Sequence, residues 1–243
     1  MQRIHIDLYR DSNVFVTDAY DRLISKIPVM KETKGYKLFT ISGCAPEVGT
    51  TTIAINIATS LALSGRATLL VDADIRKGLA AKRLNQDLEC GMSDYLLGKV
   101  ECSDAICSTN IEKLSYLACG KENGNPVMLF NSAQFDSFIE MVSSMYDYVI
   151  FDSPTLNAAV DAGIIAEKTS GVILVAGYMQ TKMAQIRAAK QELEQLNANI
   201  IGILLNNVPR KKYKRYVGNY DYFAGTDFSK RAKRRVPKKE KKK

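Results

Sequence analysis

The sequence is poor in the features that mark membrane-spanning, disulfide-linked and zinc-binding proteins. None of its apolar runs approaches the ~18 to 20 residues of a membrane-spanning helix, and the first residues lack a basic flank followed by a long apolar stretch. The five cysteines are an odd number without C-x-x-C spacing, and His5 is the only histidine. These absences argue against a disulfide framework and a structural zinc site. We therefore expect a cytoplasmic chain whose cysteines are reduced and mostly buried.

The positive charge of the chain is concentrated at its C-terminal end. The formal net charge is +8, but residues 210–243 hold 15 of the 34 Lys and Arg and only three acids, a balance of +12. The other 209 residues carry 19 basic and 23 acidic side chains, a balance of −4. With 46% hydrophobic residues over 243 positions, the acidic part is large enough to bury a full core and is not a disordered protein.

Short apolar segments alternate with helix-length segments from residue 37 onward, which predicts an α/β fold with a mostly parallel, doubly wound sheet. Nearly continuous Val, Ile and Leu in the strands indicate a sheet covered on both faces, a three-layer α/β/α arrangement. The expected strands are 37–42, 67–72, 113–118, 146–152, 171–176 and 199–205, and the expected helices are 50–65, 132–145, 158–168 and 181–196, the last capped by Thr181.

The rest of the chain divides around this domain. Residues 1–35 read as an N-terminal arm with one amphipathic stretch, 16–27, followed by a polar connection at 31–35. Residues 36–209 form the predicted domain, and residues 210–243 form a flexible basic tail.

Polar residues follow three of the predicted strands, where ligands bind in doubly wound sheets. After the first strand comes a glycine-containing turn that leads into a helix N-terminus, which suits a phosphate group. Asp72 and Asp74 follow the second strand, and Asp152 ends the strand 146–152. Hydroxyls of Thr51 or Thr52 together with these carboxylates could hold Mg²⁺, which prefers oxygen ligands. Each of these signals alone is also compatible with an ordinary helix cap. Their order along the chain, with the loop first and the acids after it, points more specifically to a site for phosphate and magnesium.

Several segments together resemble the cytoplasmic domains of bacterial tyrosine kinases, P-loop proteins that control capsular and exopolysaccharide assembly. The wider group includes cell-division and plasmid-partition ATPases. The similar segments are LLVDADIRK, YDYVIFDSP, GMSDYLLG, IIGILLNNV and the spaced residues Asn125, Pro126, Leu129, Ser132 and Phe135. The resemblance runs from about residue 16 to residue 208.

This resemblance implies ATP and Mg²⁺ as cofactors and assigns roles to individual residues. The phosphate-binding (Walker A) loop corresponds to Pro46, Glu47, Val48, Gly49, Thr50, Thr51 and Thr52. Asp72, Asp74 and Asp152 correspond to the catalytic acids, and Thr51, Asp74 and Asp152 to the metal site. Asn206 stands where the family contacts the adenine.

Two departures weaken the expectation of kinase activity. The lysine that reaches the β and γ phosphates is replaced by Thr50, which removes a charge-assisted contact of about 1.5–3 kcal/mol. A loop glycine is replaced by Glu47, which adds a negative charge and does not adopt glycine's backbone shapes freely. Arg76 or Lys77 could substitute for the lysine.

The N-terminal arm departs from the family as well. The family's oligomerisation helix carries E-x-x-R-x-x-R, and the corresponding positions here are Asp18, Asp21 and Ile24. Only the acidic residue, at Asp18, is kept, so the sequence does not decide whether the chain self-associates through this helix. In the alternative interpretation, the segment is a docking helix with Tyr20, Leu23 and Ile27 on its apolar face.

The tail contains a tyrosine cluster, Tyr213, Tyr216, Tyr220 and Tyr222. In the resembled family such a cluster is the autophosphorylation substrate, and each phosphate adds about −1.5 to −2 charges, so phosphorylation could switch the tail's electrostatics. A solvated charge run with incidental aromatics is the plainer alternative. Attraction to an anionic inner leaflet also accounts for the lysines, whereas nucleic acid is disfavoured because no nucleic-acid-binding fold accompanies them.

Three functions follow. The first is an ATP-dependent protein-tyrosine autokinase that regulates capsular or exopolysaccharide biosynthesis and works with a membrane-embedded activator, peripheral to the inner face of the plasma membrane. The second is a catalytically inactive scaffold, a pseudokinase, that binds the same membrane partner; Thr50 and Glu47 favour it. The third is a partition-type ATPase, which the tail tyrosines and the GMSDYLLG segment argue against.

Overall fold

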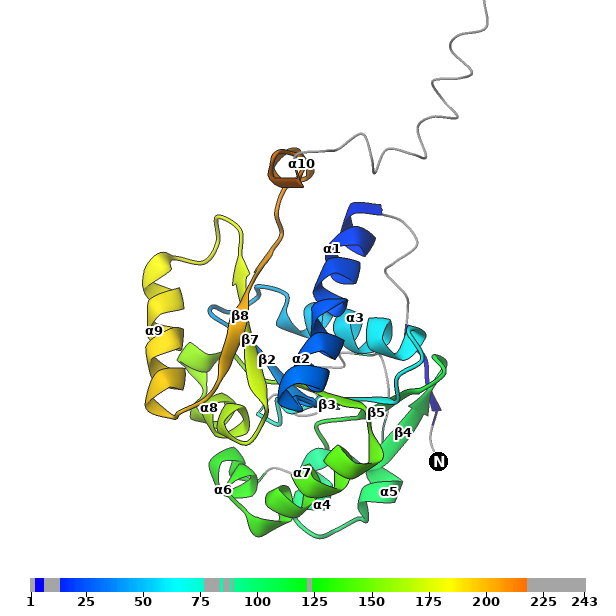
Figure 1. The fold of residues 1–243 in the computed structure, drawn as a ribbon. Helices are drawn as coiled ribbons and strands as arrows, with labels where there is room; N and C mark the ends of the chain where they lie inside the picture. Colours follow the sequence, from blue (N-terminus) through cyan, green and yellow to red (C-terminus); the bar gives the residue numbers. More distant parts are fainter. Residues whose placement is uncertain are drawn as a thin grey trace, which may run out of the picture. The chain divides into compact units, whose positions relative to one another are not determined.

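The computed structural model describes residues 3–6, 14–76, 84, 88, 90–121 and 124–217. The chain divides into two units, Met1–Asn207 and Val208–Lys243. In this described part of the chain, the strands and all helices but α10 belong to the first unit (Figure 1).

Within the described residues, the first unit is built on an eight-stranded sheet in the order β1-β4-β5-β3-β6-β2-β7-β8. The strands are β1 Arg3–Ile4, β2 Leu38–Gly43, β3 Thr68–Asp72, β4 Ile106–Thr109, β5 Leu114–Leu117, β6 Tyr148–Asp152, β7 Gly171–Gly177 and β8 Ile200–Asn206. All neighbouring pairs are parallel except β4 with β5. The prediction of a mostly parallel, doubly wound sheet is confirmed.

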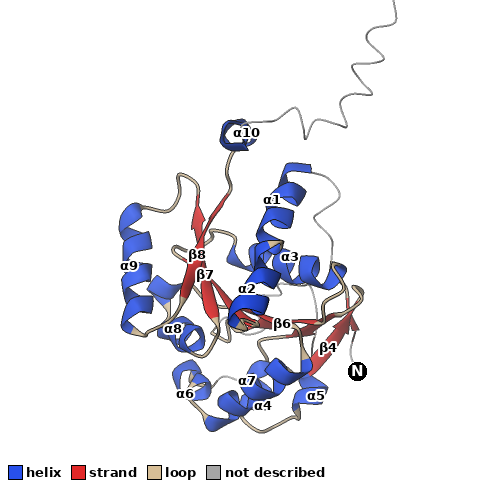
Figure 2. Cartoon of the chain, viewed as in Figure 1, coloured by secondary structure: helices blue, strands red, loops and turns tan. Residues whose placement is uncertain are grey.

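Helices cover both faces of this sheet, as Figure 2 shows. They are α1 Val14–Ile24, α2 Lys26–Lys34, α3 Thr50–Leu63, α4 Met92–Leu96, α5 Cys102–Ala105, α6 Pro126–Phe130, α7 Ala133–Met145, the short 3₁₀ helix η3 Leu156–Ala158, α8 Val160–Glu167 and α9 Met183–Gln195. Neighbouring residues of one strand belong to different hydrophobic clusters. Ile150 belongs to the cluster that contains side chains of α1, α2 and α3, whereas Phe151 belongs to the cluster that contains side chains of α4, α7 and α8. This alternation produces the predicted three layers.

The six predicted strands and four predicted helices are all present, with small differences at their ends. The prediction of a polar connection at 31–35 was wrong, because α2 continues to Lys34 and ends at Gly35 in the left-handed conformation. Thr181 does not cap α9: the cap position is Lys182, and the Thr181 hydroxyl accepts a hydrogen bond from the Gly177 N–H instead. The strands β1 and β4 were not predicted from the sequence.

The N-terminal arm packs through its apolar face against α3 and the core cluster on that side of the sheet. Tyr20 and Ile27 are buried, Leu23 packs against the same cluster, and the Tyr20 hydroxyl is hydrogen-bonded to Asn56 on α3. Burial raises the pKa of Tyr20 to about 12, so the phenol stays neutral. In the single chain, this segment therefore packs as the docking-helix interpretation predicts, with its apolar face buried.

Two segments that resemble the kinase family have structural roles. Asn125 caps α6 and Ser132 caps α7, each accepting a backbone N–H bond, and Phe135 is fully buried. Asp94 of the GMSDYLLG segment accepts N–H bonds from Gly91 and Lys121. These segments identify the fold rather than the chemistry.

In the second unit the described residues end at 217, and they contain the helix α10, Arg210–Val217. This helix was not predicted from the sequence, which indicated a flexible tail from residue 210. Among the described residues, none of the helices is long and apolar enough to cross a membrane.

Candidate functional site

A loop of six residues connects β2 to α3 and forms the candidate phosphate site. The first hydrogen bond of α3 joins the Ile53 N–H to the Gly49 carbonyl. The N–H groups of Thr50, Thr51 and Thr52 therefore have no carbonyl of a preceding turn to bind, and the helix dipole is positive at this end. This arrangement favours an anion, as the glycine-containing turn predicted.

Two loop residues have left-handed backbone conformations. Gly49 has φ +88°, and a Cβ atom there would overlap the side-chain nitrogen of Asn206. Glu47 has φ +58°, where a residue with a side chain is strained by roughly 1–2 kcal/mol. The loop thus keeps a glycine-type shape although its glycine is replaced, and Glu47 is exposed to solvent.

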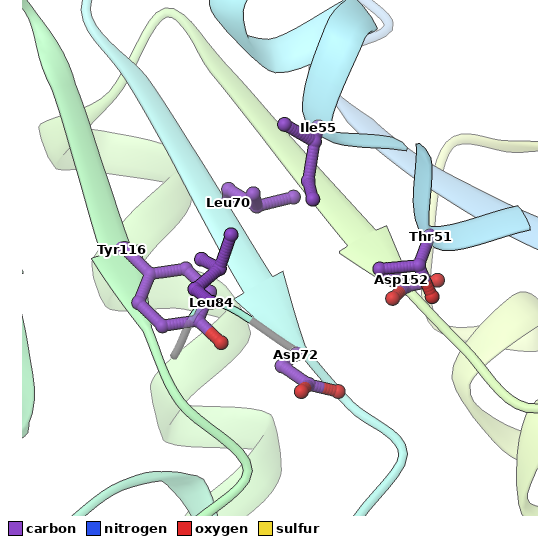
Figure 3. A pocket seen from close by; sticks show the side chains of 7 residues that line it. All are labelled: Thr51, Ile55, Leu70, Asp72, Leu84, Tyr116 and Asp152. Atoms are coloured by element: carbon purple, nitrogen blue, oxygen red, sulfur yellow. The ribbon is translucent and has the colours of Figure 1, made fainter. Parts of the chain in front are cut away.

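The predicted acids and Thr51 converge beyond the ends of adjacent strands. Asp72 on β3 and Asp152 on β6 lie opposite each other in the sheet, and both are buried. Together with Thr51 and four other residues they line a cavity of about 10 Å³, enough for roughly one water molecule (Figure 3). Asp74 is also buried but does not line this cavity; its N–H donates to the Asp72 carboxylate at 3.2 Å.

The donor atoms at this cavity fit a magnesium ion that arrives with a phosphate ligand. The hydroxyl of Thr51 and the carboxylates of Asp72 and Asp152 are hard oxygen donors, which Mg²⁺ prefers. In the described part of the chain, no group of three or more His, Cys, Asp or Glu side chains could hold a metal by itself. Magnesium at this position would therefore depend on phosphate and water oxygens as well.

Arg76 does not reach across the loop to take the place of the missing lysine. Its Nε and Nη2 atoms both lie 2.8 Å from Oδ1 of Asp161, a fully buried residue at the start of α8. Breaking this pair would leave a carboxylate buried without its partner, which costs several kcal/mol. Lys77, the other candidate, lies outside the described residues.

Asp161 and the bonds of three side-chain amides to the loop were not predicted from the sequence. Asn206, predicted to contact adenine, donates from Nδ2 to the Val48 carbonyl at 2.8 Å. Asn157 and Gln180 also donate to loop carbonyls. Their positions shortly after β6 and β7 were the only available signal, since an amide that holds a carbonyl has no characteristic sequence spacing.

The other predicted site residues are distributed as follows. Pro46 and Thr52 are exposed, Val48 is buried, and Thr50 packs with its hydroxyl over Gly43, where a Cβ atom would lie 2.8 Å from it. Burial raises the pKa of the adjacent Cys44 thiol to about 11, so this cysteine is neutral and poorly reactive at the loop.

The tyrosine cluster is described only in part. Tyr213 and Tyr216 lie on α10, whereas Tyr220 and Tyr222 lie outside the described residues.

Sheet order, loop and acids define the chain as a P-loop α/β protein. The family described as "AAA domain" matches residues 37–200. The septum site-determining protein MinD of Pyrococcus horikoshii, solved with Mg-ADP, shares the fold, with a TM-score of 0.58 and 20% identity over 74% of this chain and 76% of that one.

More similar relatives define the family further. Tyrosine-protein kinase CpsD of Streptococcus agalactiae serotype III is 35% identical over 176 residues, 72% of this chain and 76% of the relative. Tyrosine-protein kinase ptk of Acinetobacter johnsonii is 36% identical over 173 residues, 71% of this chain; these residues are 24% of that longer protein. The solved chimerical protein CapA2B2 has a TM-score of 0.77 and 27% identity, covering 86% of this chain and 94% of that one. The chain belongs to the family of bacterial tyrosine-protein kinases with a P-loop domain.

Proposed function

We propose that this protein is an ATP-dependent tyrosine-kinase-like regulator of capsular or exopolysaccharide biosynthesis. The observation that carries the proposal is the convergence of Thr51, Asp72 and Asp152 on one cavity beside the phosphate loop. The family relationship makes ATP with Mg²⁺ the expected ligand and a tyrosine hydroxyl the expected acceptor.

The loop residues and the acids at the strand ends have different expected roles in nucleotide binding and phosphate transfer. Backbone N–H groups of the loop and of the first turn of α3 would bind the phosphates of the nucleotide at the positive end of this helix. Magnesium bound with the nucleotide would neutralise phosphate charge. Thr51 and Asp152, which line the cavity, would hold it, and Asp74, whose N–H contacts Asp72, is the third ligand that the family resemblance implies. Asp72, supported by the Asp74 N–H, accepts the proton of an incoming tyrosine.

A second candidate function is a catalytically inactive scaffold that keeps the family's fold and partner. Thr50 supplies no charge for the transferring phosphate, and Arg76 is engaged by Asp161. Glu47 places a negative charge at the loop. Phosphoryl transfer depends on positive charge at this position, so these residues favour weak nucleotide binding without efficient transfer.

The partner and location proposed from the family are a membrane-embedded activator of the polysaccharide co-polymerase type and the inner face of the plasma membrane. Self-association of the kinase domain is the further proposed contact. The charge of the tail favours attachment to an anionic membrane surface. Residues 210–243 have a formal net charge of +12, and each basic residue near such a surface contributes ~1 kcal/mol. Phosphorylation of Tyr213, Tyr216, Tyr220 and Tyr222 would lower this attraction.

Incubation of the purified chain and its activator fragment with labelled ATP and Mg²⁺ tests the proposal. The kinase function predicts label on the four tail tyrosines and its loss in Asp72→Ala and Asp152→Ala. Asp136→Ala is a matched control, because this acid lies on the exposed surface of α7 and pairs with Lys168. Label without a requirement for Asp152 would refute the assigned site.

The scaffold function predicts a different result from the same assay. The natural chain would transfer no phosphate, whereas Thr50→Lys combined with Glu47→Gly would restore transfer. Gly43 leaves the space beside position 50 that the first carbons of a lysine need. ATP hydrolysis without any tyrosine label would instead indicate a partition-type ATPase.

A further inference from the structure

Three side-chain amides hold alternate carbonyl groups of the phosphate loop. They come from η3, from the turn after β7 and from the end of β8, each more than a hundred residues away from the loop. The bonds are Asn157 Nδ2 to the Cys44 carbonyl at 2.8 Å, Gln180 Nε2 to the Pro46 carbonyl at 3.3 Å, and Asn206 Nδ2 to the Val48 carbonyl at 2.8 Å. We call these three residues the amide clasp.

The clasp brackets the strained residue of the loop. Glu47, with φ +58°, lies between Pro46 and Val48, whose carbonyls are both held. A residue with a side chain stays in this conformation only where the surroundings over-determine it. The bonds of Gln180 and Asn206 provide such a constraint on both sides.

The clasp also determines which way the loop's dipoles point. A carbonyl that accepts from outside the loop cannot point into it, and successive N–H groups can then gather on the inner side as an anion-binding concavity. In a loop whose lysine is replaced by Thr50, these N–H groups supply a larger share of phosphate binding. Gly49 belongs to the same arrangement, because only a residue without Cβ leaves room for the Asn206 amide.

We propose that Asn206 is a positioning residue whose amide, with Gln180 and Asn157, keeps the phosphate loop in its anion-binding shape against the strain at Glu47. The proposal rests on the proposed function in that it assumes a phosphate ligand. It assigns Asn206 a role that is distinct from contacting the base.

The first measurement concerns the loop without any ligand. Backbone ¹⁵N relaxation of the full chain is compared for the natural protein and for Asn206→Ala. We expect lower order parameters at residues 47–49 in the variant and unchanged values elsewhere in the sheet. Asn199→Ala is the matched control, because Asn199 makes the same amide-to-carbonyl bond, to Ser170 at 2.9 Å, at the opposite end of β8. Unchanged order parameters in Asn206→Ala would overturn the proposal.

The second measurement separates positioning from base recognition. Binding of Mg·ATP and of Mg·tripolyphosphate, which has no base, is measured by calorimetry for the same variants. We expect Asn206→Ala to weaken both ligands by about tenfold and Asn199→Ala to weaken neither. Loss of affinity for Mg·ATP alone would mean that Asn206 reads the base, and would overturn the proposal.

A third variant tests the connection to Glu47. Glycine at position 47 removes the strain that the clasp opposes, so the loss caused by Asn206→Ala should fall below threefold in a Glu47→Gly background. An equal loss in both backgrounds would refute the link between the two residues. If the natural chain binds neither ligand, the proposed function fails, and the relaxation data alone decide the clasp: a loosened loop supports it and an unchanged loop refutes it.

Discussion

The ion pair between Arg76 and Asp161 permits a stability prediction of definite sign and size. Asp161 is fully buried, and Arg76 binds it through Oδ1 only; among the described residues, its Oδ2 has no hydrogen-bond partner. Removing one member of a buried pair costs about 3–5 kcal/mol. Because the Arg76 side chain is 43% exposed, we take the lower end and expect Arg76→Ala to cost about 3 kcal/mol. For a domain of this size, that lowers the melting temperature by roughly 6–12 °C.

Urea denaturation and thermal melting measure this loss, and two further variants test its cause. Adding Asp161→Asn to Arg76→Ala removes the buried charge, so the double variant should be more stable than Arg76→Ala alone. Lys190→Ala removes an exposed pair with Glu194 and should cost no more than about 0.5 kcal/mol. The reasoning is refuted if Arg76→Ala costs as little as Lys190→Ala, or if the second substitution destabilises further.

Three other predictions concern packing and pH. The hydrogen bond from Lys31 lowers the pKa of Asp147, so this pair stabilises the fold above pH ~4 and loses its effect as the pH falls through the lowered pKa. Because Asp147 is partly exposed, Lys31→Ala should cost less than about 1 kcal/mol at neutral pH. Urea denaturation at a series of acid pH values should show this cost shrinking to what the contact of Lys31 with the Tyr148 ring contributes. Gly91→Ala should fail to fold or lose several kcal/mol, because its Cβ would collide with the Ala118 carbonyl; normal urea stability would contradict this. Phe135→Ala, which empties a fully buried ring position, should cost about 3–5 kcal/mol in the same assay, and a loss under 1 kcal/mol would contradict the packing.

Much of the sheet could be predicted because most of its strands are unbroken runs of mainly apolar residues. Segments such as Tyr148–Asp152 and Gly171–Gly177 are buried on both faces, and their unbroken apolar runs carry that information locally. The strands β1 and β4 are short, with two and four residues, and have no such run. The helix α2 was missed because its polar end, residues 31–34, is held by the Lys31 contact with Asp147, a residue far away in the sequence.

The sequence by itself determined the class of site: the order of the loop, the two acids after one strand and Asp152 after another, and the replacement of the lysine by Thr50. Only the tertiary structure decided how the site is held. It showed that Arg76 is engaged by Asp161, that Glu47 adopts a glycine-type conformation, and that distant amides hold the loop's carbonyls. The physical reason is that residue identity and spacing report local propensity, whereas a hydrogen bond between residues 158 positions apart depends on which strands the completed sheet brings together.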